Sequence, residues 1–256
     1  MRFCAPCGSP RADGRKRIYA LRRDELPGYR LLQEHSCGLV CEKISDRASL
    51  PASAVLPVSV PDLERLRQAI ISGDPGQAMP ALAGLREVPE AEAIPLLLLG
   101  LGQGPFIVRS LACAGLGVKR SEAGRQALLQ ALRHDDDANV RAEAANSLAS
   151  YGVEQAWPVL HEVFQADGQW LVRCSILAAL AEQEAMRPEW LLALGCLAVA
   201  DADGTVRVGG AEVLGRLLVE GQGEEADLAA AREALRGLQG DPDHRVVAAA
   251  LNGLQA

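Results

Sequence analysis

One motif occurs four times in the chain, as IVRSLACAGLG (residues 107–117), NVRAEAANSLA (139–149), LVRCSILAALA (171–181) and TVRVGGAEVLG (205–215). Successive copies are 32, 32 and 34 residues apart, and a weaker copy, RVVAAALNGLQ, follows at residues 245–255. Each clear copy pairs Val with Arg and continues with small residues and a leucine. A fixed period near this length is typical of a solenoid, in which each repeat buries a face against its neighbour.

The spacing within each repeat predicts two α-helices. The repeat valine, the alanine-rich positions after it and the leucine eight residues on form one apolar face at helical spacing. Gly, Asp and Pro separate these segments from one another. From Asp62 onward we expect about six helix pairs, giving an all-α, right-handed α-α superhelix. The second helices of the pairs are expected to begin near Gly76, Pro105, Ala138, Gln169, Gly204 and Asp243.

Two signals indicate where these helices start. Asp137, Asp203 and Asp243 each stand three residues before a repeat valine, where an N-cap carboxylate accepts amide hydrogens of the second helix. Pro95 and Pro158 occur in the similar segments Ala-Ile-Pro and Ala-Trp-Pro, and proline is tolerated in the first turn of a helix. We therefore predict that the first helices begin close to these prolines.

Composition divides the chain into three parts. Residues 1–44 are basic and hold four of the seven cysteines, residues 45–61 form a Pro-, Ser- and Ala-rich linker, and residues 62–256 carry the repeats. Residues 1–60 hold ten Lys or Arg against six Asp or Glu, whereas residues 61–256 hold 16 against 27, so their net charges are +4 and −11. An acidic solenoid is repelled by phosphate backbones, and 4% aromatic residues leave little for base stacking. We therefore expect a protein partner, not a nucleic acid.

The apolar runs are short. The longest one, Ala93 to Leu101, is interrupted by Pro95 and is too short to span a bilayer, and the N-terminus lacks an apolar segment of signal-peptide length. We expect a soluble, cytoplasmic protein that does not insert into membranes.

A second pattern combines Asp and Arg. Three aspartates stand six residues before the arginines of three repeats: Asp135 before Arg141, Asp167 before Arg173 and Asp201 before Arg207. This spacing lets each arginine reach the loop between the helices of its own or an adjacent repeat. We expect a structural ladder of charge-assisted hydrogen bonds along the stack.

Repeats of about 32 residues with D-x5-R, V-R-x-x-A-x-x-x-L and Ala-Ile-Pro resemble HEAT repeats, in particular the short form called PBS-lyase HEAT-like repeats. The resemblance covers about residues 62–256, and the last repeat departs from it because Val247 replaces the arginine, which suits a capping repeat. The resemblance implies protein binding. It also implies two more specific roles, since relatives include phycobilin lyases of the E/F type and proteins that help to dismantle phycobilisomes.

Second helices usually line the concave face of such a solenoid. Positions three and six after the repeat valine are expected to point away from the core and to form a polar, acidic strip. Trp170 and Trp190 lie near turns, where an exposed aromatic side chain can anchor a contact. A solvated helix face is the alternative interpretation. The candidate partner-binding residues are Glu143, Asn146, Ser175, Glu212, Asn252 and Trp170.

Catalytic residues are not evident. The four histidines occur at spacings that pair none of them with a serine or cysteine nucleophile. Cys113 and Cys174 could hold a bilin transiently, but a cysteine within an apolar helix is more often a small core residue. The preferred interpretation is a scaffold or assembly factor, with a phycobiliprotein or another photosynthetic complex as its partner. The alternative is a subunit of a phycobilin lyase or isomerase.

The N-terminal cysteines form two close pairs, Cys4 with Cys7 and Cys37 with Cys41, and His35 stands beside the second pair. Thiolates at such spacings can close a tetrahedral zinc site. The second pair has three intervening residues and no following glycine. The alternatives to a zinc ribbon are a disordered basic tail and an upstream stretch included by an early start codon. The basic segment could also contact nucleic acid, through Arg15, Lys16, Arg17, Arg22 and Arg23.

Zinc binding by these cysteines predicts about one zinc ion per chain in the purified full-length protein. Replacing Cys4 and Cys7 by Ser removes two of four ligands and should release the metal. Elemental analysis of both proteins measures this. Equal zinc contents in the two proteins would exclude the site.

Overall fold

The structure, a computed structural model, describes residues 29–32, 40–43 and 62–255. The chain divides into two compact units, residues 1–59 and 60–256. In the first unit, strand β1 (Tyr29–Leu32) pairs with strand β2 (Val40–Lys43) in antiparallel orientation, with Tyr29 opposite Lys43. Of the predicted zinc ligands, Cys4, Cys7 and Cys37 lie outside the described residues, and Cys41 falls in β2, where only the backbone is described.

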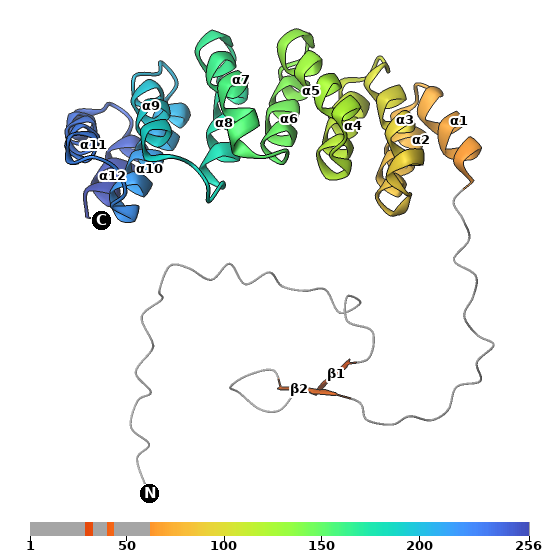
Figure 1. The fold of residues 1–256 in the computed structure, drawn as a ribbon, viewed down its shortest axis with the longest axis horizontal. Coiled ribbons are helices and arrows are strands. Elements are labelled where there is room, and N and C mark those ends of the chain that lie inside the picture. Colours follow the sequence, from red (N-terminus) through yellow and green to blue (C-terminus); the bar gives the residue numbers. More distant parts are fainter. Residues whose placement is uncertain (1–28, 33–39, 44–61, 256) are drawn as a thin grey trace, which may run out of the picture. The chain divides into compact units, whose positions relative to one another are not determined.

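Residues 62–255 fold into twelve α-helices in six antiparallel pairs, which follow one another in a row (Figure 1). The first helices of the pairs are α1 (Leu63–Ile71), α3 (Glu90–Leu101), α5 (Glu122–His134), α7 (Val153–Ala166), α9 (Pro188–Val199) and α11 (Glu225–Gly237). The second helices are α2 (Pro75–Gly84), α4 (Phe106–Lys119), α6 (Ala138–Ala149), α8 (Trp170–Ala181), α10 (Gly204–Glu220) and α12 (His244–Leu254). Two short 3-10 helices, Leu85–Glu87 and Leu238–Gly240, extend α2 and α11.

The core is one continuous layer between the first and second helices. The repeat valines are fully buried at all five positions: Val108, Val140, Val172, Val206 and Val246. The leucines eight residues later are buried in four repeats and half-buried in the last. The predicted apolar face is therefore confirmed as core packing. None of the described helices is long and apolar enough to cross a membrane.

The predicted starts of the second helices are confirmed to within one residue. Asp137, Asp203 and Asp243 are the N-caps of α6, α10 and α12, and each carboxylate accepts the amide hydrogen two residues on, at 2.8–2.9 Å. These bonds satisfy backbone donors that have no partner inside the helix. The caps thus fix where each second helix begins.

The prediction that Pro95 and Pro158 mark helix starts is wrong. Each proline is the sixth residue of its helix, because α3 begins at Glu90 and α7 at Val153. A proline there removes one intrahelical hydrogen bond and leaves the carbonyl four residues earlier without its amide partner. Both prolines are exposed. The carbonyls that lose an amide partner belong to Ala91 and Glu154, which are exposed as well, so water can donate a hydrogen bond to each carbonyl instead.

An Arg-Asp ladder connects successive repeats. In each step, the Nε and Nη2 atoms of an arginine in a second helix donate to both carboxylate oxygens of an aspartate in the next repeat, at 2.6–3.2 Å. The four pairs are Arg109 with Asp135, Arg141 with Asp167, Arg173 with Asp201 and Arg207 with Asp241. The carboxylate bound by each arginine therefore belongs to the following repeat, not to the aspartate six residues before it.

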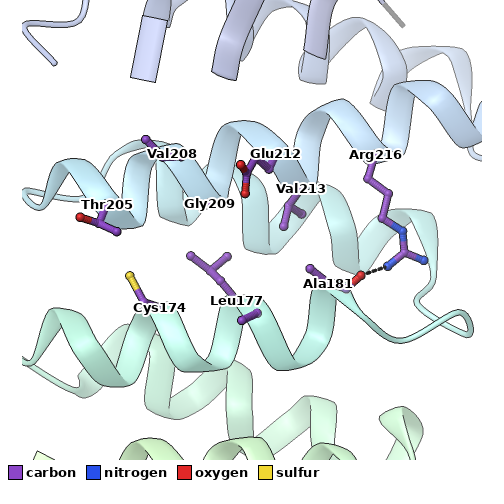
Figure 2. A pocket seen from close by; sticks show the side chains of 10 residues that line it. Cys174, Leu177, Ala181, Thr205, Val208, Gly209, Glu212, Val213 and Arg216 are labelled. Carbon is purple, nitrogen blue, oxygen red and sulfur yellow. Dashed lines mark hydrogen bonds between the residues drawn. The ribbon is translucent and has the colours of Figure 1, made fainter. Parts of the chain in front are cut away.

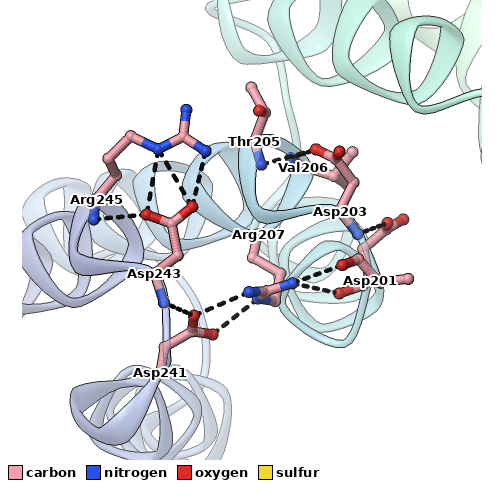
Figure 3. Close-up of polar contacts among 9 residues, drawn as sticks. Asp201, Asp203, Thr205, Val206, Arg207, Asp241, Asp243 and Arg245 are labelled. Atoms are coloured by element: carbon pink, nitrogen blue, oxygen red, sulfur yellow. Dashed lines mark hydrogen bonds and ion pairs between the residues drawn. The ribbon is translucent and has the colours of Figure 1, made fainter.

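Each arginine also binds its own repeat. Arg207 Nη1 donates to the carbonyl oxygens of Asp201 and Ala202 in the loop before α10, at 3.0 and 2.9 Å (Figure 3). Its partner Asp241 accepts a third hydrogen bond from the backbone amide of Asp243, at 2.8 Å. One guanidinium thus holds two consecutive loops at a fixed separation, and its bidentate geometry allows little rotation between them.

The environment of the ladder keeps its aspartates ionised. Their side chains are only 8–11% exposed, and this burial acts to raise the pKa of Asp135, Asp167 and Asp201. Hydrogen bonds from the arginine and from the backbone amide two residues on outweigh the burial, so the pKa of each carboxyl lies below its usual value.

Replacing Asp135 by Asn should lower the free energy of unfolding by about 2 kcal/mol, because Arg109 loses the one of its two carboxylate partners that is largely buried. The neighbouring Asp136 is the matched control. It also bonds Arg109, but its side chain is 93% exposed, so Asp136→Asn should cost less than about 0.5 kcal/mol. Chemical denaturation measures both values, and equal losses would contradict the structural role of the ladder.

The same pairs predict an acid-labile fold. A carboxyl with a lowered pKa in the folded state stabilises the protein above the unfolded-state pKa of about 4, and that stability is lost as pH falls through the folded-state value. The free energy of unfolding should therefore drop below about pH 4. The decline should be shallower in Asp135→Asn. An identical pH profile for the two proteins would contradict the pKa direction.

Candidate protein-binding surface

The second helices lie on the inner side of the row. In Figure 1, α5 and α7 lie along the outer side of a shallow arc and α6 and α8 along its inner side. Successive second helices pack closely, whereas α5, α7 and α9 have few contacts with one another. Small residues allow this approach: a Cβ atom on Gly215 of α10 would stand 2.9 Å from the Cα atom of Gly253 in α12. We call the exposed side chains of the second helices the inner surface.

Hydrogen bonds close the contacts among α4, α6 and α8. Ser147 Oγ donates to the Cys113 carbonyl at 3.0 Å, and Ser150 Oγ donates to the Gly117 carbonyl at 2.8 Å. Between α6 and α8, Ser175 Oγ donates to the Ala142 carbonyl at 2.8 Å. These hydroxyls fill the space between neighbouring second helices and leave only the outermost side chains exposed.

Four of the six candidate partner-binding residues are exposed on the inner surface. Asn146, Glu212 and Asn252 occupy the sixth position after the repeat valine in α6, α10 and α12, and Trp170, the first residue of α8, is 47% exposed. At the sixth position α4 and α8 carry Ala114 and Ala178. The exposed row is therefore neutral over most of its length, with Glu212 as its one carboxylate.

The other two candidates face the helix contacts. Ser175 is engaged by α6, as described above. Glu143 is half-buried, and the Oγ atom of Ser147 lies 3.5 Å from the Oε1 atom of Glu143. Burial raises the pKa of this carboxyl, and it outweighs the hydrogen bonds from Asn146 and Ser147, which lower the pKa. The acidic strip predicted for this face is thus much weaker than the residue types indicate, because Glu143 is partly withdrawn from solvent.

A groove of about 420 Å³ opens on the inner surface between α8 and α10. Its walls are apolar and its rim carries Glu212 and Arg216 (Figure 2). The lining residues are Cys174, Leu177, Ala178 and Ala181 from α8, with Thr205, Val208, Gly209, Glu212, Val213 and Arg216 from α10. Arg216 crosses the far end of the groove and donates to the Ala181 carbonyl at 2.8 Å. A second apolar depression of about 350 Å³ lies between α2 and α4.

Trp190 is not a free anchor. It stacks on Trp157 of α7, with ring centroids 5.1 Å apart, and the Arg187 guanidinium lies 4.5 Å from the centroid of the Trp190 ring. Arg187 in turn forms a bidentate ion pair with Glu154 at 2.8–3.0 Å. This cluster bridges the first helices α7 and α9, which otherwise pack loosely, so its role in the structure is to join two repeats.

The described thiols are poorly suited to nucleophilic chemistry. Cys113 is fully buried, and burial together with the nearby Glu143 raises its pKa to about 12. Cys174 lines the groove, and burial, Asp203 and Asp201 raise its pKa above the usual value. Both thiols are therefore protonated at neutral pH, whereas the reactive form of a cysteine is the thiolate. Among the described residues, no group of three or more His, Cys, Asp or Glu is arranged to hold a metal ion.

The apolar lining of the groove was not among the sequence predictions. A signal was present: at the third position after the valine, α4, α6 and α8 carry Leu111, Glu143 and Ser175, whereas α10 carries Gly209. A glycine in the middle of a helix is unfavourable by about 1 kcal/mol relative to alanine, and it therefore indicates a packing or functional reason.

Comparison with known proteins supports the fold. Residues 94–181 match the family model for HEAT repeats. Among solved structures, the Escherichia coli protein YibA is similar to this chain with a TM-score of 0.56 and 18% identity, over 75% of this chain and 69% of YibA. No curated protein matches the sequence. Residues 94–181 therefore carry HEAT repeats, and the described helices of residues 62–255 are stacked in a HEAT-like solenoid.

Two further solved structures are more distant. Human deoxyhypusine hydroxylase has a TM-score of 0.40 and 14% identity over 75% of this chain and 96% of its own. The complex of CpcE and CpcF of phycocyanin lyase from Nostoc sp. PCC7120 has a TM-score of 0.37 and 16% identity over 81% of this chain and 97% of its own. At these scores neither likeness indicates a function.

Proposed function

We propose that this protein is a non-catalytic scaffold that binds a protein partner on its inner surface. The observation that supports this proposal most strongly is the distribution of exposed apolar side chains. Of the eight large hydrophobic residues exposed within residues 62–255, six lie on second helices, namely Phe106, Ile107, Val118, Trp170, Val219 and Leu251. Exposed apolar groups that are concentrated on one set of helices favour a protein-protein contact.

The charged groups favour the same conclusion. The ladder arginines are each occupied by a carboxylate and by one or two backbone carbonyls, so they are not free to bind an anionic ligand. The repeat region as a whole has a net charge of −11, which disfavours nucleic acid and anionic lipid. A neutral or basic protein surface is the partner that suits this balance.

Photo-crosslinking tests the assignment of the inner surface. Benzoylphenylalanine replaces one exposed residue at a time in the full chain, at Asn146 or Asn252 on second helices or at Gln126 or Gln165 on first helices. We expect the same partner to be crosslinked from both second-helix positions in extract of the source organism. Crosslinks from the first-helix positions alone, or from none of the four, would contradict the proposal.

The more specific form of the proposal names a phycobiliprotein as the partner, on the basis of the resemblance between the repeats and PBS-lyase HEAT-like repeats. A crosslinked partner of this kind would carry covalent bilin and fluoresce in the presence of zinc. A crosslinked partner without bilin would exclude this form and leave the scaffold proposal intact. Bilin on this chain itself would instead support the alternative, a subunit of a phycobilin lyase. The raised pKa values of Cys113 and Cys174 disfavour that alternative, because protonated thiols attach bilin poorly.

A further inference from the structure

The contact between α8 and α10 has a glycine at the third position after the repeat valine, where the other second helices carry a side chain. In α8 the third residue after the valine is Ser175, whose hydroxyl bonds α6. In α10 this residue is Gly209, and a Cβ atom placed there would stand 3.0 Å from Leu177 Cδ1. Leu177 therefore packs against bare backbone, and no side chain from this position of α10 extends into the space beside it. The groove is the result.

The groove runs along both helices. On α10 its lining extends from Thr205 to Arg216, a span of twelve residues that corresponds to about 16 Å of helix. On α8 the residues Trp170, Cys174 and Ala178 follow at intervals of four, so the exposed indole continues the line of the groove toward the start of the helix. A third helix of about three turns matches this length.

The rim of the groove is negative. Glu212 is exposed, and within residues 62–255 its carboxylate has neither a hydrogen bond nor an ion pair. The nearby cation, Arg216, is already bound by Glu220 at 2.6 Å and by the Ala181 carbonyl. The unpaired charge at the edge of an apolar groove is therefore a carboxylate, which a cation of a ligand would neutralise.

We propose that the α8–α10 groove binds an amphipathic helix of a partner protein, which inserts large apolar side chains between Leu177 and Val208 and places a Lys or Arg beside Glu212. This inference rests on the proposed function and names the chemistry of the partner. Helix-in-groove recognition of this kind uses apolar residues at helical spacing as anchors. The charge beside the anchors then selects basic helices over acidic ones.

Peptide selection on the full chain tests the proposal. A phage library of random 16-residue peptides is selected on the wild-type protein, and fluorescein-labelled copies of the enriched peptides are titrated by anisotropy. Ala178→Trp fills the groove from an exposed position, and Ala123→Trp adds the same side chain to an exposed position of α5 as the matched control. Circular dichroism verifies that both variants fold.

We expect the enriched peptides to carry apolar residues at intervals of three or four with an adjacent Lys or Arg. Ala178→Trp should weaken their binding more than about tenfold, while Ala123→Trp leaves it unchanged. Glu212→Lys, an exposed substitution that spares the core, should weaken binding about tenfold, and changing the peptide's Lys to Glu should restore it.

Three results would overturn the proposal: no enrichment, enriched peptides that are acidic, or binding that Ala178→Trp leaves intact. Any of them combined with crosslinks from Asn146 and Asn252 would leave the scaffold function standing and exclude the groove as its binding site. Absence of crosslinks from the inner surface would refute the scaffold function itself.

Discussion

The bidentate contact between an arginine of one repeat and an aspartate of the next is the constraint on which this solenoid depends. Helix pairs stacked only by Ala, Leu and Val would have several ways to rotate against each other, since apolar contact is not directional. The guanidinium removes this freedom because it binds two carboxylate oxygens ahead and one or two carbonyls behind. Each loop is thus fixed relative to the next, and the second helices lie in a defined row.

Because the second helices lie in a defined row, the residues between neighbouring second helices determine whether the surface there is closed or opens into a groove. Where a serine occupies the third position after the valine, as Ser175 does in α8, its hydroxyl bonds a carbonyl of the preceding second helix and closes the surface. Where Gly209 replaces it, the ladder still holds the two loops together through Arg173 and Asp201, while a groove opens farther along the helices. Rigid spacing and local small residues together produce an apolar groove in a continuous stack.

The sequence predicted the fold well because the repeat valines and leucines follow a strict helical period, and because Asp caps mark the second helices. It predicted the Asp and Arg residues of the ladder, but not their pairing, since the bonded partners are 26–34 residues apart and come together only through stacking. Arg109 and Asp241 were missed for this reason.

The inner surface was harder to predict. A single helical period separates the side facing the first helix from the opposite side, whereas each second helix also contacts the second helices before and after it. Ser175 and Glu143 were therefore expected to be exposed, although they lie at these lateral contacts. The prolines of α3 and α7 misled for a related reason, since tolerance of proline inside a helix depends on solvent exposure, which only the folded chain defines.

A double-mutant cycle at Arg141 and Asp167 tests the central role of the ladder most directly. The two residues are replaced by Ala, singly and together, and the free energies of unfolding are compared by chemical denaturation. If the bidentate pair couples the third and fourth repeats, the double variant should lose less than the two single losses combined, with a coupling of at least about 1 kcal/mol. Losses that add to within about 0.3 kcal/mol would show that the pair contributes no specific connection between repeats.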